Sequence, residues 1–338
     1  MQEMMTITPV EWALLGLAIV ALLQSAVSCM QLRRDVVKVE ARPAFRGLPR
    51  AMSDVAKRGQ LSAPRDCPMD TQMIIASFNI NGIKARITAL TDWLEQSQPD
   101  VAILQEIKSV DDAFPREIFE DKGFNVETHG QKGFNGVAIL SKLPLEDVTR
   151  GLPGAAGAGR DGADDEEARY IEATVVGDKP VRICGLYLPN GNPTPGPKYD
   201  YKLRWMERLE ARAKDLLTLE EPALMAGDYN IIPQAEDAAR PDAWRDDALF
   251  RLDSRNAFRR IQNLGLTEAF RARQPGSGHY SFWDYQAGAW DKNDGIRIDH
   301  FLLTPQCADL LNDAWIESEV RGGEKPSDHV PVWVDLAA

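Results

Sequence analysis

The chain has 338 residues, 44% of them hydrophobic and 27% charged, which indicates a globular protein with a substantial core, folded as one large domain or two ordinary ones. Its formal net charge of −12 argues against a uniformly basic nucleic-acid-binding surface. A local basic patch or a divalent cation held by carboxylates could still bind phosphate, because binding depends on the local field rather than on the sum of charges.

The first 72 residues differ from the rest. Trp12–Met30 is a 19-residue run without charge, long enough to span a bilayer, and residues 31–65 follow with nine basic and three acidic residues and read as a linker. A cleaved signal peptide is disfavoured because the residues before the run include Glu3 and Glu11 but no Lys or Arg. A membrane anchor that leaves the main domain in the cytoplasm is one interpretation. A translation start placed too far upstream of Met73 is the other, and is slightly preferred.

From Met73 onward, short apolar runs alternate with amphipathic stretches, so we expect residues 73–338 to form one domain and residues 1–72 to lie outside its fold. Helical spacing appears after the first run and again over residues 205–216, and residues 151–167 form a Gly/Ala-rich and then acidic loop. The apolar runs predict seven strands, at Ile74–Phe78, Val101–Leu104, Gly136–Leu140, Val181–Leu188, Ala223–Ala226, Ile298–Leu303 and Val330–Leu336.

The cysteines give little support for a metal or disulfide framework. Cys29, Cys67, Cys184 and Cys307 are widely spaced and form no CxxC or Cys/His cluster. Zinc and a disulfide-based fold are therefore disfavoured, and the pattern indicates a reducing compartment.

Glu106 ends the apolar run that begins at Val101. A buried strand places such a carboxylate at the rim of a sheet, where open α/β sheets bind ligands. Glu106 is therefore a candidate ligand for a hard cation, although taken alone a surface glutamate at a strand end is the simpler interpretation.

Asp228 and Asn230 follow another apolar run, directly after Gly227. A period of two points both side chains to the same side, which suits an acid that holds or deprotonates water and an amide that orients the acid. The alternative is a Gly-Asp turn closed by the side chain of the aspartate, and the two interpretations are evenly weighted.

Asp328 and His329 lie between two prolines near the last predicted strand. Neighbouring residues point in different directions, so we assign Asp328 to a metal and His329 to a phosphate, with Asp299 holding the imidazole from behind. A polar turn is the alternative. The competing His300 enters an apolar strand and is expected to be a packed residue.

Polar side chains that could face a phosphate follow two more strands. Asn79 and Asn81 share one face of the first strand, and amides can orient phosphate or metal-bound water without adding negative charge. Tyr187 and Asn190 could donate to phosphate oxygens. A strand end before a glycine turn, and a tyrosine with a solvated hydroxyl, are the corresponding structural alternatives.

Two further groups are candidates for substrate contacts. Arg86 and Lys132, with Lys84, could contact DNA phosphates, although solvated surface charges are more common. Phe282 and Trp290 belong to an aromatic cluster that is usually core, but beside a phosphodiesterase site could wall a pocket for an extruded sugar.

In this order, the motifs resemble the exonuclease III / abasic-site (AP) endonuclease family of the endonuclease–exonuclease–phosphatase superfamily. The resemblance extends from Met73 to Ala338 and leaves residues 1–72 without a counterpart, which supports the upstream-start interpretation. The motifs that carry it are Ser77–Gly82, Leu104–Glu106, His129–Gly133, Gly227–Asn230, Arg297–Asp299 and Lys325–Trp333.

The resemblance implies an α/β fold, a DNase I-like four-layer sandwich of two packed mixed β-sheets flanked by helices. It also implies a Mg²⁺-dependent DNA phosphodiester hydrolase of base-excision repair, with Mn²⁺ as a possible substitute. Such an enzyme is an abasic-site endonuclease and 3′–5′ exodeoxyribonuclease on double-stranded DNA with abasic sites or 3′ ends. We expect a monomer without an obligate protein partner, cytoplasmic and associated with the nucleoid.

The resemblance also implies roles for single residues. Glu106 matches the principal metal ligand, with Asn81 and Asp328 nearby, and Asp228 matches the residue that positions or deprotonates the attacking water, oriented by Asn230. The remaining roles are a phosphate contact by His329 backed by Asp299, phosphate-side hydrogen bonds from Tyr187, Asn190 and Asn79, and the sugar-pocket wall from Phe282 and Trp290.

Two alternatives stay open. Another phosphodiesterase of the superfamily, acting on lipid or inositol phosphates, would suit a membrane-like head. A catalytically dead, membrane-tethered DNA-binding protein is the second. The presence of Glu106, Asp228, Asn230, Asp299 and His329 argues against it, because a scaffold does not need them.

Overall fold

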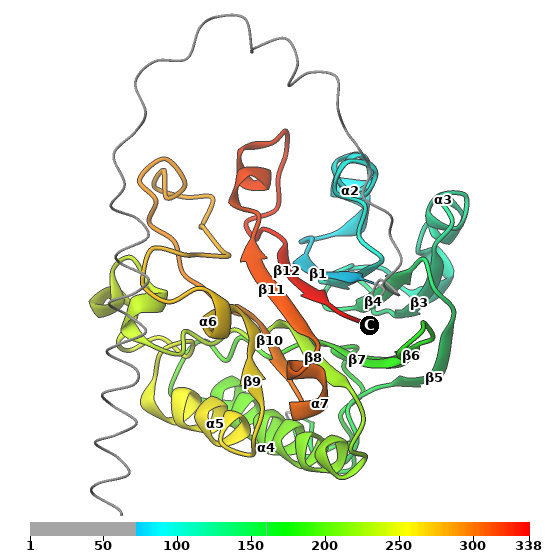
Figure 1. Cartoon of the computed structure of the whole chain (residues 1–338). Helices are drawn as coiled ribbons and strands as arrows, with labels where there is room; N and C mark the ends of the chain where they lie inside the picture. Colours follow the sequence, from blue (N-terminus) through cyan, green and yellow to red (C-terminus); the bar gives the residue numbers. More distant parts are fainter. Residues whose placement is uncertain (1–71, 160) are drawn as a thin grey trace, which may run out of the picture. The chain divides into compact units, whose positions relative to one another are not determined.

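Two six-stranded sheets lie face to face and carry helices on their outer sides (Figure 1). The computed structural model describes residues 72–159 and 161–338. The sequence-based interpretations of the anchor, the linker and the translation start therefore fall, apart from Gln72 and Met73, on residues outside the described part. Within the described residues, no helix is both long and apolar enough to cross a membrane.

The first sheet has the order β11-β12-β1-β2-β4-β3 and the second the order β5-β6-β7-β8-β10-β9. The strands of the first sheet are β1 Met73–Asn79, β2 Val101–Gln105, β3 Asn125–His129, β4 Val137–Ser141, β11 Leu311–Ile316 and β12 Val332–Leu336. Those of the second are β5 Leu145–Arg150, β6 Tyr170–Val175, β7 Val181–Tyr187, β8 Ala223–Asp228, β9 Thr267–Glu268 and β10 Asp299–Leu303. The helices are α2 Ile83–Ser97, α3 Arg116–Glu120, α4 Pro197–Thr218, α5 Leu252–Gln262, α6 Ala269–Arg273 and α7 Pro305–Ala308.

Both sheets are mixed, and each is built around one parallel pair. In the first sheet β1 runs parallel to β2, and in the second β7 runs parallel to β8. The other neighbouring strands pair antiparallel. The predicted four-layer sandwich of two mixed sheets is therefore confirmed, as are the seven predicted strands, which correspond to β1, β2, β4, β7, β8, β10 and β12.

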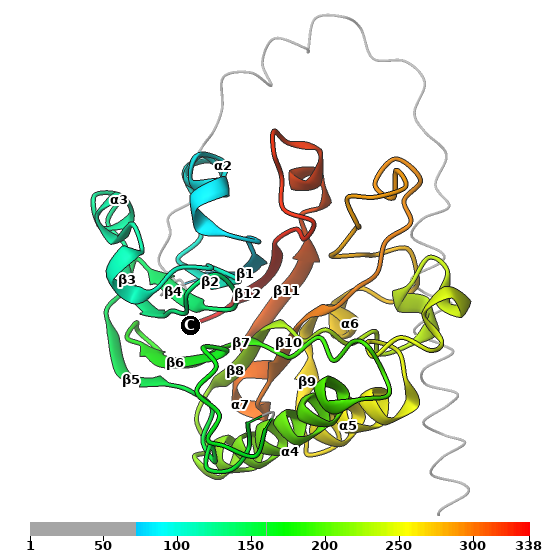
Figure 2. The same cartoon turned by 180° about the vertical axis from the view of Figure 1, so that it is seen from behind.

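The core between the sheets consists of the inward side chains of both sheets, including Ile103 of β2, Ile183 of β7 and Leu224 of β8. These strands are buried on both faces, because α2 and α3 cover the outer face of the first sheet, and α4 and α5 cover that of the second (Figure 2). Double burial explains why their sequences are continuous apolar runs rather than alternating patterns. Burial of this apolar surface is the main driving force for the sandwich.

The topology brings the polar strand ends to one edge of the sandwich. Parallel β1 and β2 end there at Asn79 and Gln105, and parallel β7 and β8 end there at Tyr187 and Asp228. Antiparallel β10 begins at the same edge, where Asp299 pairs directly with Asp228. Side chains that are more than 200 residues apart in sequence thus meet at one place.

A close contact between the two sheets, at Gly185 and Ile103, generates the first prediction. A Cβ atom on Gly185 of β7 would lie 2.6 Å from Cγ2 of Ile103 on β2. We expect Gly185→Ala alone to destabilise the fold by about 1–3 kcal/mol through overpacking. We expect Ile103→Ala alone to cost about 2–5 kcal/mol through a cavity. The double variant should lose clearly less than the sum, because each change removes the defect of the other. Urea unfolding of the four proteins measures this, and strictly additive losses would contradict the described contact.

Candidate active site

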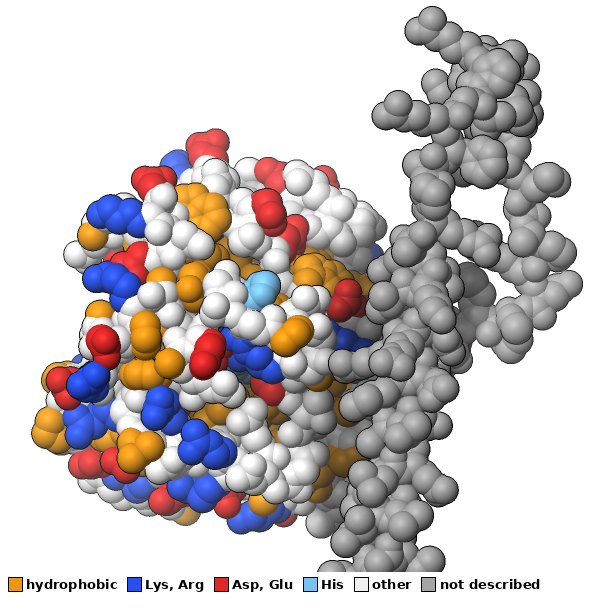
Figure 3. Space-filling view, turned by 60° about the vertical axis from the view of Figure 1, so that its left-hand side comes forward, with side chains coloured by type: hydrophobic (Ala, Val, Ile, Leu, Met, Phe, Trp, Pro, Cys, Tyr) orange, Lys and Arg blue, Asp and Glu red, His pale blue; other side chains and the backbone are white. Residues whose placement is uncertain are grey.

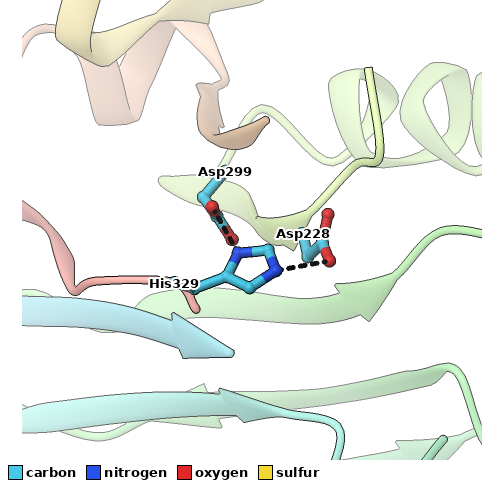
Figure 4. A group of neighbouring side chains, drawn as sticks. All are labelled: Asp228, Asp299 and His329. Carbon is cyan, nitrogen blue, oxygen red and sulfur yellow. Dashed lines mark hydrogen bonds and ion pairs between the residues drawn. The ribbon is translucent and has the colours of Figure 1, made fainter. Parts of the chain in front are cut away.

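His329 lies between two buried aspartates at the polar edge of the sandwich (Figure 4). Its Nδ1 is 2.9 Å from Oδ2 of Asp299, and its Nε2 is 3.6 Å from Oδ2 of Asp228. The first distance is that of a strong hydrogen bond, whereas the second is too long for one. The Nε2 proton therefore retains donor capacity that a substrate oxygen can use.

The two carboxylates determine the charge of the imidazole. Burial alone would lower the pKa of His329, but attraction from Asp299 and Asp228 outweighs burial and raises it to about 10. Asp299 is held in place by Ser281, whose hydroxyl donates to Asp299 Oδ2 at 2.6 Å. The arrangement holds a buried imidazolium at neutral pH, which is the donor and charge that a phosphate oxygen requires.

Asp228 is the candidate base. Burial raises its pKa to about 7; the charge of His329 opposes this increase, and Asp299 adds to it. Its Oδ1 accepts the backbone N–H of Asn230 at 2.8 Å, and its Oδ2 accepts from Nδ2 of Asn79 at 3.0 Å. A carboxylate held by two donors and titrating near neutral pH suits proton removal from water.

Glu106 lies on the neighbouring side of the same group. Asn79 Nδ2 also donates to Glu106 Oε1 at 3.0 Å, so one amide bridges the carboxylates of Glu106 and Asp228. Lys108 lies 2.9 Å from Glu106 Oε2 and also donates to Oδ1 of Asn81. Burial would raise the pKa of Glu106, but hydrogen bonds from Asn79 and Lys108 more than compensate and lower it, which keeps this carboxylate ionised.

The third part of the site is the pair Asn81 and Asp328. Asn81 Nδ2 donates to Asp328 Oδ1 at 3.0 Å, which brings the turn after β1 against the segment before β12. Arg86, a predicted DNA contact, donates instead from Nη1 to the backbone oxygen of Asn81 and from Nη2 to the hydroxyl of Tyr285. In this structure Arg86 therefore braces Asn81.

Four site residues have left-handed backbones. Asn81, Glu106, Lys108 and Asn230 have φ between 47° and 51°, which is unusual for residues other than glycine. Neighbouring backbone hydrogen bonds enforce this geometry, including those from Gly82 N–H to Glu106 O and from Lys108 N–H to Asn135 O. Strain held by surrounding structure is characteristic of functional sites.

The phosphate-side candidates lie beside Asp228. Asn190 Nδ2 donates to Oδ1 of Asn230 at 3.0 Å. Burial, together with Glu106 and Asp228, raises the pKa of Tyr187 well above 10, so its hydroxyl remains a donor. The guanidinium of Arg169 lies 4.9 Å from the centre of the Tyr187 ring.

The aromatic candidates occupy two different places. The ring of Phe282 lies 5.0 Å from that of His329, so Phe282 borders the site. Trp290 packs edge-on against Trp283 at 4.8 Å, in a cluster with Tyr280 and Val330. The structure therefore brings Phe282 into ring contact with His329, whereas Trp290 packs against Trp283.

Lys132 is exposed on the loop between β3 and β4 and is not drawn into the hydrogen-bonded group. On the face drawn in Figure 3, Lys and Arg side chains lie among Asp and Glu side chains. Acidic and basic side chains are thus mixed on this face, which does not present a uniformly negative surface.

Two donor sets could hold a metal ion. Among the described residues, one group of three acidic or histidine side chains has ligand atoms within 4.8 Å of one another: Asp228, Asp299 and His329. Asp299 Oδ1 is buried and has no hydrogen-bond partner, so it can still accept. The sequence-predicted set of Glu106, Asn81 and Asp328 offers only oxygen ligands, which suit a hard cation such as Mg²⁺.

Sequence reasoning missed three residues that this geometry uses. Lys108, two residues after Glu106, neutralises that carboxylate, and its charge next to a candidate ligand was the available signal. Ser281 had no signal of its own. Lys202 occupies the buried stripe of α4 that contains Trp205 and Leu209, and a lysine at an apolar position was the signal there.

A buried ionic network lies behind the site. Arg297 contacts Asp237 at 2.8 Å and Glu268 at 2.9 Å, and His300 is fully buried 3.0 Å from Arg297 Nη1. His300 Nε2 faces the backbone oxygen of Ile231 at 3.0 Å, so this histidine is a packed residue, as expected. The network ties the start of β10 to β9 and to the segment after β8.

The network generates a pH prediction. Burial would raise the pKa of Glu268, but Arg297 and His300 lower it to about 2, below its ordinary value of 4.5. Glu268 should therefore contribute about 3 kcal/mol of stability above pH 4.5, which is lost as pH falls towards 2. The difference in unfolding free energy between the natural protein and Glu268→Gln should shrink over this range in guanidinium titrations. The exposed control Glu236→Gln should show no such trend, and a pH-independent effect of Glu268→Gln would contradict the assignment.

Comparison with known proteins identifies the family of this chain. Residues 76–329 match the model of the Endonuclease/Exonuclease/phosphatase family. Exodeoxyribonuclease III of Haemophilus influenzae is 35% identical over 277 residues, covering 78% of this chain and 100% of the relative. An AP endonuclease from Archaeoglobus fulgidus is similar in structure with a TM-score of 0.71 and 34% identity, covering 78% of this chain and 98% of the other.

A second similar structure was solved with DNA bound. The 3′ phosphatase NExo from Neisseria, bound to a product DNA hairpin, has a TM-score of 0.73 and 33% identity, with 78% of this chain and 99% of that chain covered. The resemblance to the exonuclease III / AP endonuclease family is confirmed. The chain belongs to the Endonuclease/Exonuclease/phosphatase family.

Proposed function

We propose that the chain is a metal-dependent DNA phosphodiester hydrolase of base-excision repair, acting as an abasic-site endonuclease and 3′–5′ exodeoxyribonuclease. The observation that carries this proposal is the buried His329 held between Asp228 and Asp299, one amide away from Glu106. The relatives named as exodeoxyribonuclease III and AP endonuclease support the same chemistry.

Each side chain has a role that follows from its contacts. Asp228, held by Asn79 and the Asn230 backbone, accepts the proton of the attacking water. His329 donates from Nε2 to a phosphate oxygen, with Asp299 fixing the ring through Nδ1. The remaining donors to the phosphate are Tyr187 and Asn190, whereas the two N–H groups of Asn79 are donated to Glu106 and Asp228, so that Asn79 would reach the phosphate only by exchanging one of them. The 3′-oxygen leaves, which gives a 3′-hydroxyl and a 5′-deoxyribose phosphate at an abasic site.

We assign the metal to Glu106, with Asn81 and Asp328 as further oxygen ligands. The residues fit a hard cation because the set contains two carboxylates and an amide oxygen and no thiolate. When bound, Mg²⁺, or Mn²⁺ as a substitute, supplies positive charge that stabilises the charge developing on the phosphate. Lys108 now contacts Glu106 and Asn81. A cation bound at this position would either displace the Lys108 ammonium group or share these two ligands with it.

The substrate that we propose is double-stranded DNA with abasic sites or 3′ ends, bound by a monomer in the cytoplasm near the nucleoid. Phe282, which contacts the His329 ring, is the candidate wall for an extruded sugar, and Trp290, which packs against Trp283, is the second candidate. Lys132 lies on an exposed loop where it can reach a DNA phosphate, and Arg86 acts through Asn81. The DNA-bound relative supports this substrate over a lipid phosphodiester.

The test is incision of a duplex oligonucleotide that carries one abasic analogue, with Mg²⁺ and with EDTA. We expect nicking by the polypeptide Met73–Ala338 in Mg²⁺ only. Glu106→Ala should lower the rate by at least roughly 100-fold, because a charge-stabilising group worth about 3 kcal/mol is lost. The matched control Glu117→Ala removes an exposed carboxylate on α3 and should leave the rate unchanged.

The folded protein could fail to nick DNA and yet hydrolyse a phospholipid or an inositol phosphodiester. This result would contradict the DNA substrate and support the lipid or inositol phosphodiesterase alternative. Absence of any phosphodiesterase activity would favour the scaffold alternative. Equal activity of Glu106→Ala and the natural sequence would refute the assignment of the metal ligand.

A further inference from the structure

A lysine lies inside the apolar layer behind the phosphate side of the active site. Lys202 is the sixth residue of α4, is fully buried, and shares the inward face of this helix with Trp205 and Met206. Lysine is rarely fully buried without a charged partner, because removing an ammonium group from water is unfavourable. Its presence at a position where leucine or methionine would pack requires a reason.

The contacts of the ammonium group provide that reason. Lys202 Nζ donates to the backbone oxygen of Asn230 at 2.6 Å and to that of Asn190 at 3.0 Å. Asn230 follows β8 and Asn190 follows β7, so one side chain ties together the two turns that carry the phosphate-side amides. Among the residues that the structure describes, no carboxylate lies within ion-pair distance of Lys202.

The stem of the lysine is fitted to the same place. Gly191 has φ of +93°, and a Cβ atom on it would lie 2.7 Å from Cδ of Lys202. The turn after Asn190 thus passes directly over the lysine stem. Burial lowers the pKa of Lys202 to about 7, although attraction from Asp228 and Asp247 opposes that decrease. The ammonium group is therefore held by the two backbone carbonyls and by the field of distant carboxylates.

Lys202 fixes the turns that carry the side-chain amides of Asn190 and Asn230. Asn190 Nδ2 donates to Oδ1 of Asn230, whose Nδ2 donates to the backbone oxygen of Leu188 at 2.9 Å. The backbone N–H of Asn230 donates to Asp228. A shift of either turn would therefore move the base and both amides relative to the phosphate.

We infer that Lys202 is a positioning residue for phosphodiester cleavage, whose buried amine holds the Asn190 and Asn230 turns through two hydrogen bonds and thereby aligns Asp228 with the phosphate. It touches no substrate, because it lies beneath the two turns. The inference rests on the proposed function and adds a residue to its machinery.

The test compares the full chain carrying Lys202→Met, Lys202→Gln and Met206→Leu with the natural sequence on the abasic duplex. Methionine keeps the unbranched stem and removes the donor, whereas glutamine restores a neutral donor. Met206→Leu is a packing control on the same buried face. We expect Lys202→Met to lower kcat roughly 10- to 100-fold and to change KM less than about threefold, because misaligned catalytic groups affect the chemical step more than binding. Lys202→Gln should recover part of kcat.

Circular dichroism and thermal melting establish that the variants are folded at the assay temperature. Should Lys202→Met not fold, Lys202→Gln measured against Met206→Leu decides the question. An undiminished kcat in the folded lysine variants, or a loss confined to KM, overturns the positioning role while the natural chain still cleaves DNA. Absence of cleavage by the natural chain would instead overturn the proposed function, and the two failures are thereby distinct.

Discussion

The pairing of one buried imidazole with two buried aspartates is the interaction on which the rest of the site depends. Asp299 at 2.9 Å and Asp228 at 3.6 Å hold His329 as a cation, although burial alone favours the neutral ring. The Nε2 N–H of this imidazolium is a fixed, charge-assisted donor for a phosphate oxygen. A chain with a net charge of −12 can therefore contact a phosphate through a buried donor such as His329, without a uniformly basic surface.

The strand topology of the sandwich brings His329, Asp228 and Asp299 together. The parallel pairs β1–β2 and β7–β8 end at one edge, and antiparallel β10 begins there with Asp299 opposite Asp228. Because central strands such as β2 and β8 are buried on both faces, they are apolar, and their polar chemistry is confined to their ends and the following turns. The left-handed backbones of Asn81, Glu106 and Asn230 are the local strain that this confinement imposes.

The layers and the candidate residues were predictable from the sequence to different extents. Apolar runs that end in acids or amides are visible without a structure, so β1, β2, β8 and β10 and their terminal residues could be predicted. Strand β5, with its exposed and polar side chains, and the two-residue β9 have no such signal, and only pairing with neighbours makes them strands. The hydrogen bond from Arg86 to the backbone oxygen of Asn81 could not be predicted either, because it depends on tertiary structure. From the sequence, the charge of Arg86 suggested only a DNA contact. Lys202 could have been noticed in the sequence, because it is a lysine at a position where the helical periodicity of α4 predicts an apolar residue.

The protonation state of His329 tests the account most directly. With four histidines in the chain, ¹⁵N spectra of labelled protein can be assigned by comparison with His329→Gln. We predict that both ring nitrogens of His329 remain protonated from about pH 6 to beyond about pH 8, because its pKa is raised well above the ordinary 6.5. An imidazole that titrates near 6.5, or that is neutral throughout this range, would contradict the buried cation and the phosphate recognition built on it.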